Sequence, residues 1–287
     1  MSEDRIAMYW EKYENNDIKC GLCPHNCYIK ENTAGKCGAR ENRAGSLIAS
    51  GYGCVTSIAL DPIEKKPLYM FHPGKKIVSI GGYGCNLNCP HCQNHNISME
   101  YQKVKIEHMT PEIIKEIAVM AVEDGNIGVA YTYNEPLIGY EFVISCSNLI
   151  RREGLMNVLV TNGYINEEPL TNIIPLIDAM NIDIKGYHNR TYNKLGGTLE
   201  PVKRTIEMSH KKSHIEVTTL VIPGENEDEV EEIALWLSKI DPNIPYHLSR
   251  FYPRYKYSDR APTPPETMFR LRDTAEKYLN HVFIGNM

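Results

Sequence analysis

The chain has 287 residues, of which 42% are hydrophobic, and a formal net charge of −5 at pH 7. This length supports one large α/β core with a small appendage, and the acidic balance argues against bulk nucleic-acid binding. No apolar run approaches the ~20 residues of a membrane span, and the N-terminus does not resemble a signal peptide, so we expect a cytoplasmic protein without membrane partners.

Residues 1–75 are rich in cysteine, glycine and proline, and they form the predicted Cys-rich appendage. Four of the nine cysteines fall within 18 residues, and this spacing predicts a closed four-coordinate metal site. Zinc would make the site a structural clip, whereas a second [4Fe–4S] cluster would make it an electron relay, and the spacing does not separate these two. The four predicted ligands are Cys20, Cys23, Cys27 and Cys37.

From residue 76 onward, short apolar runs alternate with amphipathic segments. Strands are predicted at 76–80, 127–131, 156–160, 179–184, 215–222, 245–251 and 281–285. Helices are predicted at 110–125, 137–153, 166–174, 200–212 and 230–240, and a capping box at 263–266 opens a last helix. Strict alternation predicts a parallel sheet with right-handed crossovers. Because the count falls short of eight, we predict an open, partial (β/α)6 TIM-like barrel over residues 76–287.

The most informative motif follows the first of these strands, in the segment Gly81-Gly-Tyr-Gly-Cys85-Asn-Leu-Asn-Cys89-Pro-His-Cys92. Three thiolates hold three corners of a [4Fe–4S] cluster and leave one iron with an open position. An open iron binds the methionine moiety of S-adenosylmethionine (SAM) and passes an electron to its sulfonium, which releases a 5′-deoxyadenosyl radical. A zinc knuckle is the alternative, but it usually pairs CxxC units and needs a fourth ligand. Cys54 and Cys146 fit no motif and are expected to be buried as hydrophobic residues.

This motif, with the residues up to Ser98, resembles the radical SAM superfamily. Within it the chain is similar to the branch of pyruvate formate-lyase activating enzymes, and most to the radical SAM member of a system that also contains Memo-type and Ammecr-type proteins. Relatives often continue into a tail with further cysteines, whereas this sequence ends at Met287, so functions of that tail are expected to be absent. The matching segments are residues 20–27, 35–42, 61–68, 131–136, 161–163, 183–185 and 249–251.

The resemblance implies that polar residues at the strand ends bind SAM. Glu135 stands where relatives bind the SAM amino group, although a strand-end carboxylate also caps helices. Asp183 and Lys185 match an Asp-x-Lys pair near SAM, with a simple surface ion pair as the alternative. His247 lies on a strand that carries a SAM-contacting histidine, and His91 replaces an aromatic beside adenine. The predicted SAM-binding set is His91, Thr132, Asn134, Glu135, Asn162, Asp183, Lys185 and His247.

The predicted function is therefore that of a radical SAM enzyme whose radical abstracts hydrogen from an unidentified small molecule or peptide. The alternatives are an activase of a glycyl radical enzyme and a non-catalytic iron–sulfur electron carrier. The expected partners are SAM, a low-potential donor of the flavodoxin or ferredoxin type, and either Memo-type and Ammecr-type proteins or a glycyl radical enzyme. A basic and aromatic loop at 250–257 is a candidate for substrate recognition, or simply an exposed loop.

Overall fold

The computed structural model describes residues 4–287, and the first three residues of the N-terminus considered above for a signal peptide lie outside it. Its centre is an eight-stranded sheet in the order β15-β14-β13-β12-β11-β10-β8-β7. All neighbours from β8 to β15 pair in parallel, and β7 pairs with β8 antiparallel. The strands are β7 (Ser57–Pro62), β8 (Lys76–Gly81), β10 (Asn126–Tyr131), β11 (Met156–Thr161), β12 (Ala179–Asp183), β13 (His214–Val221), β14 (Tyr246–Arg250) and β15 (Val282–Gly285).

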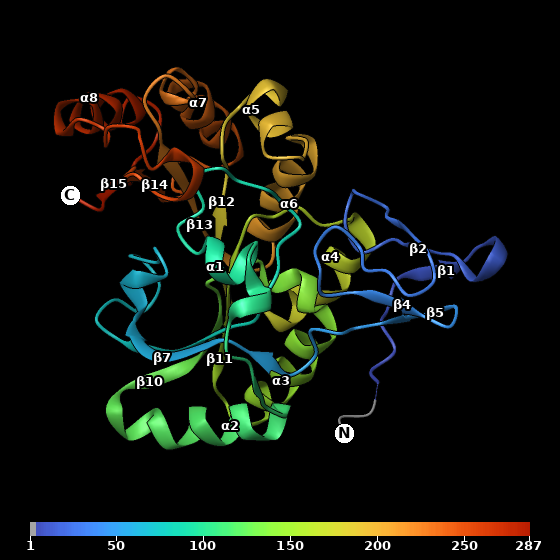
Figure 1. The fold of residues 1–287 in the computed structure, drawn as a ribbon. Coiled ribbons are helices and arrows are strands. Elements are labelled where there is room, and N and C mark those ends of the chain that lie inside the picture. Colours follow the sequence, from blue (N-terminus) through green and yellow to red (C-terminus); the bar gives the residue numbers. More distant parts are fainter. Residues whose placement is uncertain (1–3) are drawn as a thin grey trace.

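The helices lie along the sheet and leave it as an open barrel whose edge strands are β7 and β15 (Figure 1). This confirms the partial TIM-like architecture. In α2, the Thr110 hydroxyl accepts a hydrogen bond from the Ile113 amide at 3.4 Å, as its N-cap position predicts. The α-helices are α1 (His95–Ser98), α2 (Pro111–Met120), α3 (Tyr140–Arg152), α4 (Glu167–Ile173), α5 (Asn189–Lys194), α6 (Glu200–His210), α7 (Val230–Ile240) and α8 (Pro265–Ala275).

One expectation needs correction. The capping box predicted at 263–266 is wrong, because the N-cap of α8 is Pro264 and the Thr263 hydroxyl donates to the Val221 carbonyl at 2.7 Å. This contact ties the segment before α8 to the end of β13. The sheet also extends into the predicted appendage, because β7 lies within residues 1–75 and pairs with β8 over its whole length. The division of the chain at residue 75 stays a prediction, although β7, which precedes residue 75, belongs to the barrel sheet.

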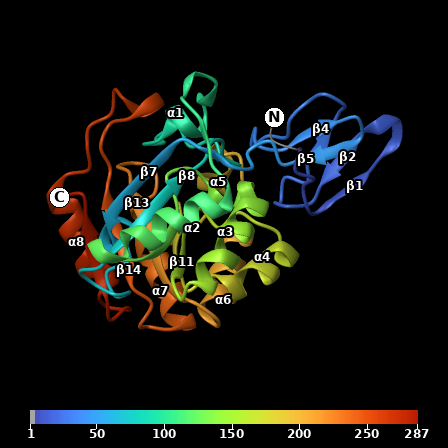
Figure 2. The same cartoon turned by 90° about the horizontal axis from the view of Figure 1, so that it is seen from below.

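The N-terminal segment that contains the four predicted cysteine ligands forms a separate region of short strands beside the barrel (Figures 1 and 2). It contains a three-stranded antiparallel sheet and a two-stranded hairpin. The Asn166 side chain, at the start of α4, donates to the Gly21 carbonyl at 2.8 Å and anchors this region to the barrel. The strands are β1 (Trp10–Lys12), β2 (Ile18–Cys20), β3 (Tyr28–Ile29), β4 (Glu41–Arg43) and β5 (Ser46–Ile48), and a further pair joins β6 (Cys54–Val55) to β9 (Glu107–His108).

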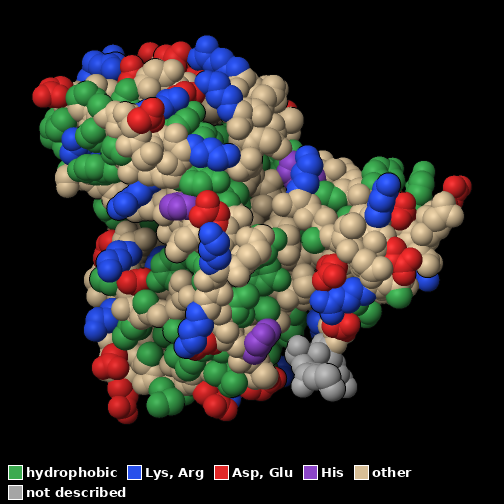
Figure 3. Space-filling view, viewed as in Figure 1, with side chains coloured by type: hydrophobic (Ala, Val, Ile, Leu, Met, Phe, Trp, Pro, Cys, Tyr) green, Lys and Arg blue, Asp and Glu red, His purple; other side chains and the backbone are tan. Residues whose placement is uncertain are grey.

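None of the helices within residues 4–287 is both long enough and apolar enough to span a membrane. On the face shown in Figure 3, acidic and basic side chains are interspersed over the surface.

A segment between β7 and β8 is fixed to the inside of the sheet by a buried carboxylate. Glu216, on β13, is fully buried and accepts hydrogen bonds from the Tyr69 and Met70 amides at 3.0 and 2.8 Å. It also pairs with His214 at 2.9 Å and with His247 at 2.6 Å. Burial alone would raise the pKa of Glu216, but the hydrogen bonds from the two histidines and Met70 outweigh it and lower the pKa to about 2.

This carboxylate predicts an acid-sensitive fold. Because the pKa of Glu216 is lowered on folding, its contribution is complete above the unfolded pKa near 4.5 and is lost as the pH falls toward 2. A shift of this size corresponds to about 3 kcal/mol. We expect the difference in unfolding free energy between wild type and Glu216→Gln to shrink by this amount between pH 5 and pH 2, measured by urea denaturation. A difference that stays constant with pH would contradict the assignment.

Candidate functional site

The three motif cysteines lie in the loop that joins β8 to α1, at the edge where the parallel strands end. The Cys92 amide donates to the Cys89 carbonyl at 3.2 Å, which closes a turn between the last two thiols. The Gly84 amide donates to the Ile97 carbonyl at 2.9 Å and holds the loop against α1. Active-site residues of α/β barrels occupy this end of the strands because the loops there converge on one mouth.

The sulfur of Cys85 receives hydrogen-bond donors from its own chain. The Leu87 amide lies 3.4 Å from it and the side-chain amide of Asn162 lies 3.7 Å from it. The Asn162 amide also donates to the Asn86 side-chain oxygen at 2.9 Å, so its orientation is fixed. Burial, followed by the Glu135 carboxylate, raises the pKa of the Cys85 thiol. The donors are therefore placed to stabilise a thiolate once a metal replaces the proton.

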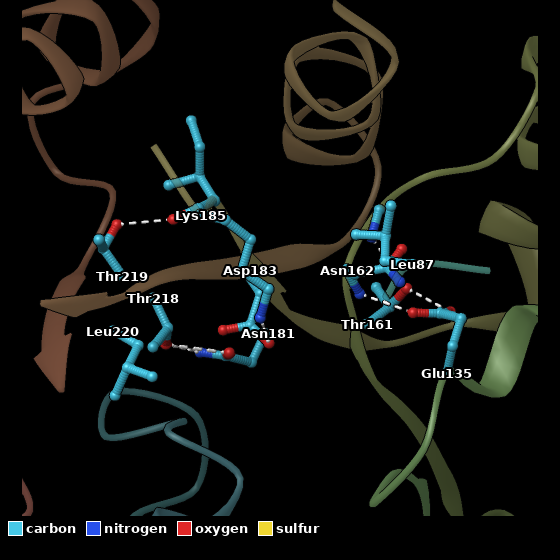
Figure 4. A network of polar contacts seen from close by, with 12 residues as sticks. Leu87, Glu135, Thr161, Asn162, Asn181, Asp183, Lys185, Thr218, Thr219 and Leu220 are labelled. Atoms are coloured by element: carbon cyan, nitrogen blue, oxygen red, sulfur yellow. Dashed lines mark hydrogen bonds and ion pairs between the residues drawn. The ribbon is translucent and has the colours of Figure 1, made fainter. Parts of the chain in front are cut away.

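Glu135 is almost fully buried, and its carboxylate points toward Thr161 and Asn162 (Figure 4). Its carboxylate accepts hydrogen bonds from the Thr161 hydroxyl and the Asn162 amide at 2.7 Å each, and from the Leu137 amide at 3.0 Å. The last contact caps the short 3-10 helix η5 (Pro136–Gly139). Burial raises the pKa of Glu135 to about 7, although the three donors act in the opposite direction. The capping role is thus observed, and the SAM-binding role stays a prediction.

Asp183 and Lys185 face the cysteine loop from the end of β12. Their side chains pair at 2.8 Å, and the Lys185 side chain is 15% exposed. Burial would lower the pKa of Lys185, but Asp183 and the Cys89 thiolate raise it well above its usual range. Burial raises the pKa of the Cys89 thiol to about 11, and the Lys185 charge opposes this. The pair is therefore partly buried beside the motif, and its SAM contact stays a prediction.

Three of the predicted SAM-binding residues make other contacts in this structure. The Asn134 side chain accepts from the Gly82 amide at 2.9 Å and donates to the Gly84 carbonyl at 3.0 Å, so it shapes the entry to the cysteine loop. Thr132, buried, donates its amide to the Ile80 carbonyl at 2.9 Å. His247 does not join the motif, because its ring pairs with Glu216 at 2.6 Å. Their SAM contacts stay predictions.

Sequence reasoning missed two residues that hold the Asp183–Lys185 segment in place. The Asn226 side chain donates to the Lys185 carbonyl at 2.8 Å. Glu229, fully buried, accepts from the Tyr187 amide at 2.5 Å and the Thr191 hydroxyl at 2.8 Å. The sequence showed Glu229 only as one of several acidic residues before a helix. Its position in a run of polar residues was the only signal in the sequence, and that position does not indicate that Glu229 is buried.

The basic and aromatic loop packs directly on the cysteine motif. The Lys256 amide donates to the Pro90 carbonyl at 3.0 Å, and the Tyr255 ring stacks on His95 at 4.6 Å. Next to this contact is a cavity with an empty volume of about 290 Å3, part of it open to solvent. The cavity is lined by His91, Lys185, Thr191, Lys194, Leu195, Ile222, Glu225, Asn226 and Tyr257. Burial lowers the pKa of His91 to about 3, so its ring is neutral at pH 7.

Comparison with known families decides the class of this site. A family model described as the radical SAM superfamily matches residues 79–237. The chain belongs to this superfamily. It is an enzyme, and its cofactors are a [4Fe–4S] cluster and SAM.

Relatives place this radical SAM enzyme near the activating enzymes. It is 43% identical over 290 residues to an uncharacterized protein of Methanocaldococcus jannaschii, covering 99% of this chain and 85% of that protein. It is 23% identical to the pyruvate formate-lyase 1-activating enzyme of Escherichia coli K12, covering 68% of this chain and 86% of that protein. This confirms the resemblance to the pyruvate formate-lyase activating branch.

The fold is also similar to that of Streptococcus suis SuiB in its crystal structure with the precursor peptide SuiA. The TM-score is 0.55 at 13% identity, covering 71% of this chain and 47% of that chain. At this level of identity, the similarity concerns the fold alone.

The residues of this radical SAM site fit the cluster. The donor set at Cys85, Cys89 and Cys92 consists of three soft thiols within one loop, which suits iron and leaves one iron without a protein ligand. The amides of Leu87 and Asn162 already point donors at one of the sulfurs. The Lys185 ammonium adds a compensating charge beside Cys89.

The contact from Asn162 predicts a measurable effect on cluster retention. Replacing Asn162 with alanine removes the only side-chain amide that reaches a motif sulfur within the described residues. Loss of such an outer-shell partner typically weakens metal binding by about 10-fold to 100-fold. We expect Asn162→Ala to lose iron to a chelator about 10-fold faster than wild type, followed by visible absorbance. Asn148→Ala, on the exposed side of α3, is the matched control, and equal loss rates in the two variants would refute the role.

Proposed function

We propose that the enzyme binds SAM at the mouth formed by the cysteine loop, the Asp183–Lys185 segment and the 250–257 loop, and acts on a small molecule or a peptide. The observation that carries this proposal is the convergence of three thiols with a partly buried lysine and a fixed donor amide at one end of the sheet. A [4Fe–4S] cluster at this site supplies the electron that cleaves SAM into methionine and a 5′-deoxyadenosyl radical.

The chain's own residues prepare this site. Asn162 and the Leu87 amide orient and stabilise the Cys85 sulfur, and Lys185 balances negative charge beside Cys89. The hydrogen bond from the Lys256 amide to the Pro90 carbonyl holds the basic loop against the cysteine loop. The predicted SAM-binding residues closest to this mouth are His91, Asn162, Asp183 and Lys185. Such chemistry fits a reducing cytoplasm with a low-potential donor of the flavodoxin or ferredoxin type.

The deciding experiment is anaerobic. The protein is reconstituted with iron and sulfide, reduced with dithionite and mixed with SAM, and 5′-deoxyadenosine is quantified beside a Cys92→Ala control. We expect the product from wild type and a loss of at least 100-fold in the variant, because one cluster ligand is missing. No product from a protein with an intact cluster would refute the proposal and favour the alternative of an electron carrier.

A second candidate is the activation of a glycyl radical enzyme, in which the abstracted hydrogen comes from a glycine of a partner protein. The similarity to the Escherichia coli pyruvate formate-lyase 1-activating enzyme favours it. Incubation with a glycyl radical enzyme of the same organism would then give the doublet signal of a glycyl radical by electron paramagnetic resonance (EPR). Turnover only in the presence of Memo-type and Ammecr-type proteins would favour the first candidate instead.

A further inference from the structure

The four N-terminal cysteines line one cavity although they come from the end of β2 and from the segments that follow it. The cavity has an empty volume of about 330 Å3, part of it open to solvent, and its wall contains all four cysteines. None of them forms a disulfide. Within residues 4–287, no three His, Cys, Asp or Glu side chains are arranged to hold a single metal ion. A tetrahedral zinc, with Zn–S bonds of about 2.3 Å, draws four sulfurs around one atom and leaves no cavity between them. The cavity between the four thiols therefore fits a group larger than a single zinc ion.

A buried arginine in the same wall lacks partners for two of its nitrogens. Arg40 is 1% exposed and lines the cavity. Its Nη2 donates to the Met8 carbonyl and pairs with Glu141 at 3.1 Å. Its Nε and Nη1 are buried without a hydrogen-bond partner. Buried donors are rarely left unpaired, so these two point to an acceptor that occupies the cavity. A cluster of iron and sulfide held by four thiolates is negatively charged and offers such acceptors.

The cavity lies against the radical SAM motif. A Cβ atom at Gly84 would overlap the carbonyl oxygen of Cys37, so only glycine permits this close approach, and the φ angle there is +82°. The His25 ring lies 2.6 Å from the Asn86 carbonyl oxygen. Gly84 and Asn86 flank Cys85. An electron that moves from Cys37 to Cys85 therefore needs only one step through space, from the Cys37 carbonyl to Gly84, which is bonded to Cys85.

We propose that Cys20, Cys23, Cys27 and Cys37 hold a second [4Fe–4S] cluster, which passes electrons to the cluster at Cys85, Cys89 and Cys92. The relay rests on the proposed function, whereas the second cluster itself does not. One electron from a flavodoxin-type or ferredoxin-type donor reduces the N-terminal cluster from the 2+ to the 1+ state. The same electron then moves to the motif cluster, which changes from 2+ to 1+ while the N-terminal cluster returns to 2+. Both steps transfer one electron only, and neither forms or breaks a bond or moves a proton.

The identity of the bound group is tested in a variant that keeps only the N-terminal cysteines, Cys85→Ala/Cys89→Ala/Cys92→Ala. After anaerobic reconstitution we expect about four irons and four sulfides per chain, and an EPR signal after reduction. One zinc per chain, or no iron, would overturn the second cluster. The reciprocal control, in which all four N-terminal cysteines are replaced by alanine, should keep only the motif cluster. Circular dichroism establishes that both variants are folded before metal analysis.

The role of Arg40 has a readout that does not depend on turnover. Arg40→Met/Glu141→Met removes both members of the buried pair and so avoids an uncompensated charge. We expect the midpoint potential of the N-terminal cluster to shift to a more negative value, because two hydrogen-bond donors to the cluster are lost while the paired charges of Arg40 and Glu141 cancel, and that of the motif cluster to stay unchanged. Equal potentials in wild type and variant would overturn the contact between Arg40 and the cluster.

The relay is tested by rapid mixing with reduced flavodoxin. In the variant without the N-terminal cysteines, we expect the motif cluster to be reduced at least 10-fold more slowly than in wild type, followed by freeze-quench EPR. Dithionite, a small reductant, should still reduce it fully and give 5′-deoxyadenosine, which separates failure of the relay from failure of the proposed function. Equal rates with flavodoxin would overturn the relay.

Discussion

Replacing Glu135 with leucine is expected to lower the free energy of unfolding by about 4 kcal/mol. The carboxylate accepts from the Thr161 hydroxyl and from the Asn162 and Leu137 amides, and leucine would leave these three buried donors unpaired. Each unpaired buried donor costs about 1–3 kcal/mol. Glu135→Gln keeps one acceptor oxygen, but its NH2 group then faces one of the donors. We therefore expect it to lower the free energy of unfolding by about half as much as Glu135→Leu. Urea denaturation of the protein without SAM measures both.

This comparison also separates the two roles considered for Glu135. A residue that caps η5 and joins β10 to β11 must matter before SAM is bound, so both variants should be destabilised in its absence. A residue whose role is to bind the SAM amino group should leave unfolding unchanged. Glu135→Gln would then weaken SAM binding at least 10-fold, measured by isothermal titration calorimetry. That second pattern would contradict the expectation and support the role implied by the family resemblance.

The strands and the cysteine motif were predictable because both depend on local sequence. The run at 76–80 became β8 (Lys76–Gly81), and the thiols follow it as the spacing predicted. Alternating apolar segments report the sheet because each strand must be buried on both sides. The antiparallel strand β7 was missed since its residues fall in a stretch dominated by turn formers, and only pairing with β8 makes it a strand.

Polar residues whose partners are distant in sequence could not be assigned. Lys66 lies in the matching segment 61–68, and its role emerges only in the fold: it is 2% exposed, pairs with Asp61 at 2.8 Å and lies over the Tyr133 ring. Arg40 and Glu141 are separated by 101 residues and form a buried pair. Composition predicts such residues on the surface, because charges are rarely buried without a partner. Only the fold reveals the partner.

The predicted capping box at 263–266 failed for a related reason. Its pattern of Thr and Glu three residues apart is local, but the Thr263 hydroxyl is taken by the Val221 carbonyl on β13. The hydroxyl thus donates to a tertiary acceptor, and it accepts no hydrogen bond from a backbone amide of α8 within the described residues. Thr110, whose hydroxyl has no such competitor, caps α2 as predicted.

Replacing Lys185 with methionine is expected to reduce cluster retention by about 10-fold to 100-fold, the usual cost of losing an outer-shell partner. The ammonium lies beside the Cys89 thiol and pairs with Asp183. Without it, the Asp183 carboxylate would face the negative charge of the thiolates with no cation between them. Iron and sulfide per chain, measured after anaerobic reconstitution and a chelator challenge, report the loss.

Two further variants identify the cause. In Asp183→Asn/Lys185→Met the unpaired carboxylate is also removed, so cluster retention should recover by about 10-fold from that of the single variant, as expected for residues that are directly coupled.

Lys194→Met removes a lysine from the same cavity wall, but one that is 55% exposed and pairs with Glu225, so it should retain the cluster like wild type. If Lys194→Met loses iron as readily as Lys185→Met, the general positive charge of the mouth, and not the particular charge of Lys185, holds the cluster. If the double variant shows no recovery, Lys185 acts on the thiolates directly and Asp183 serves only to orient it.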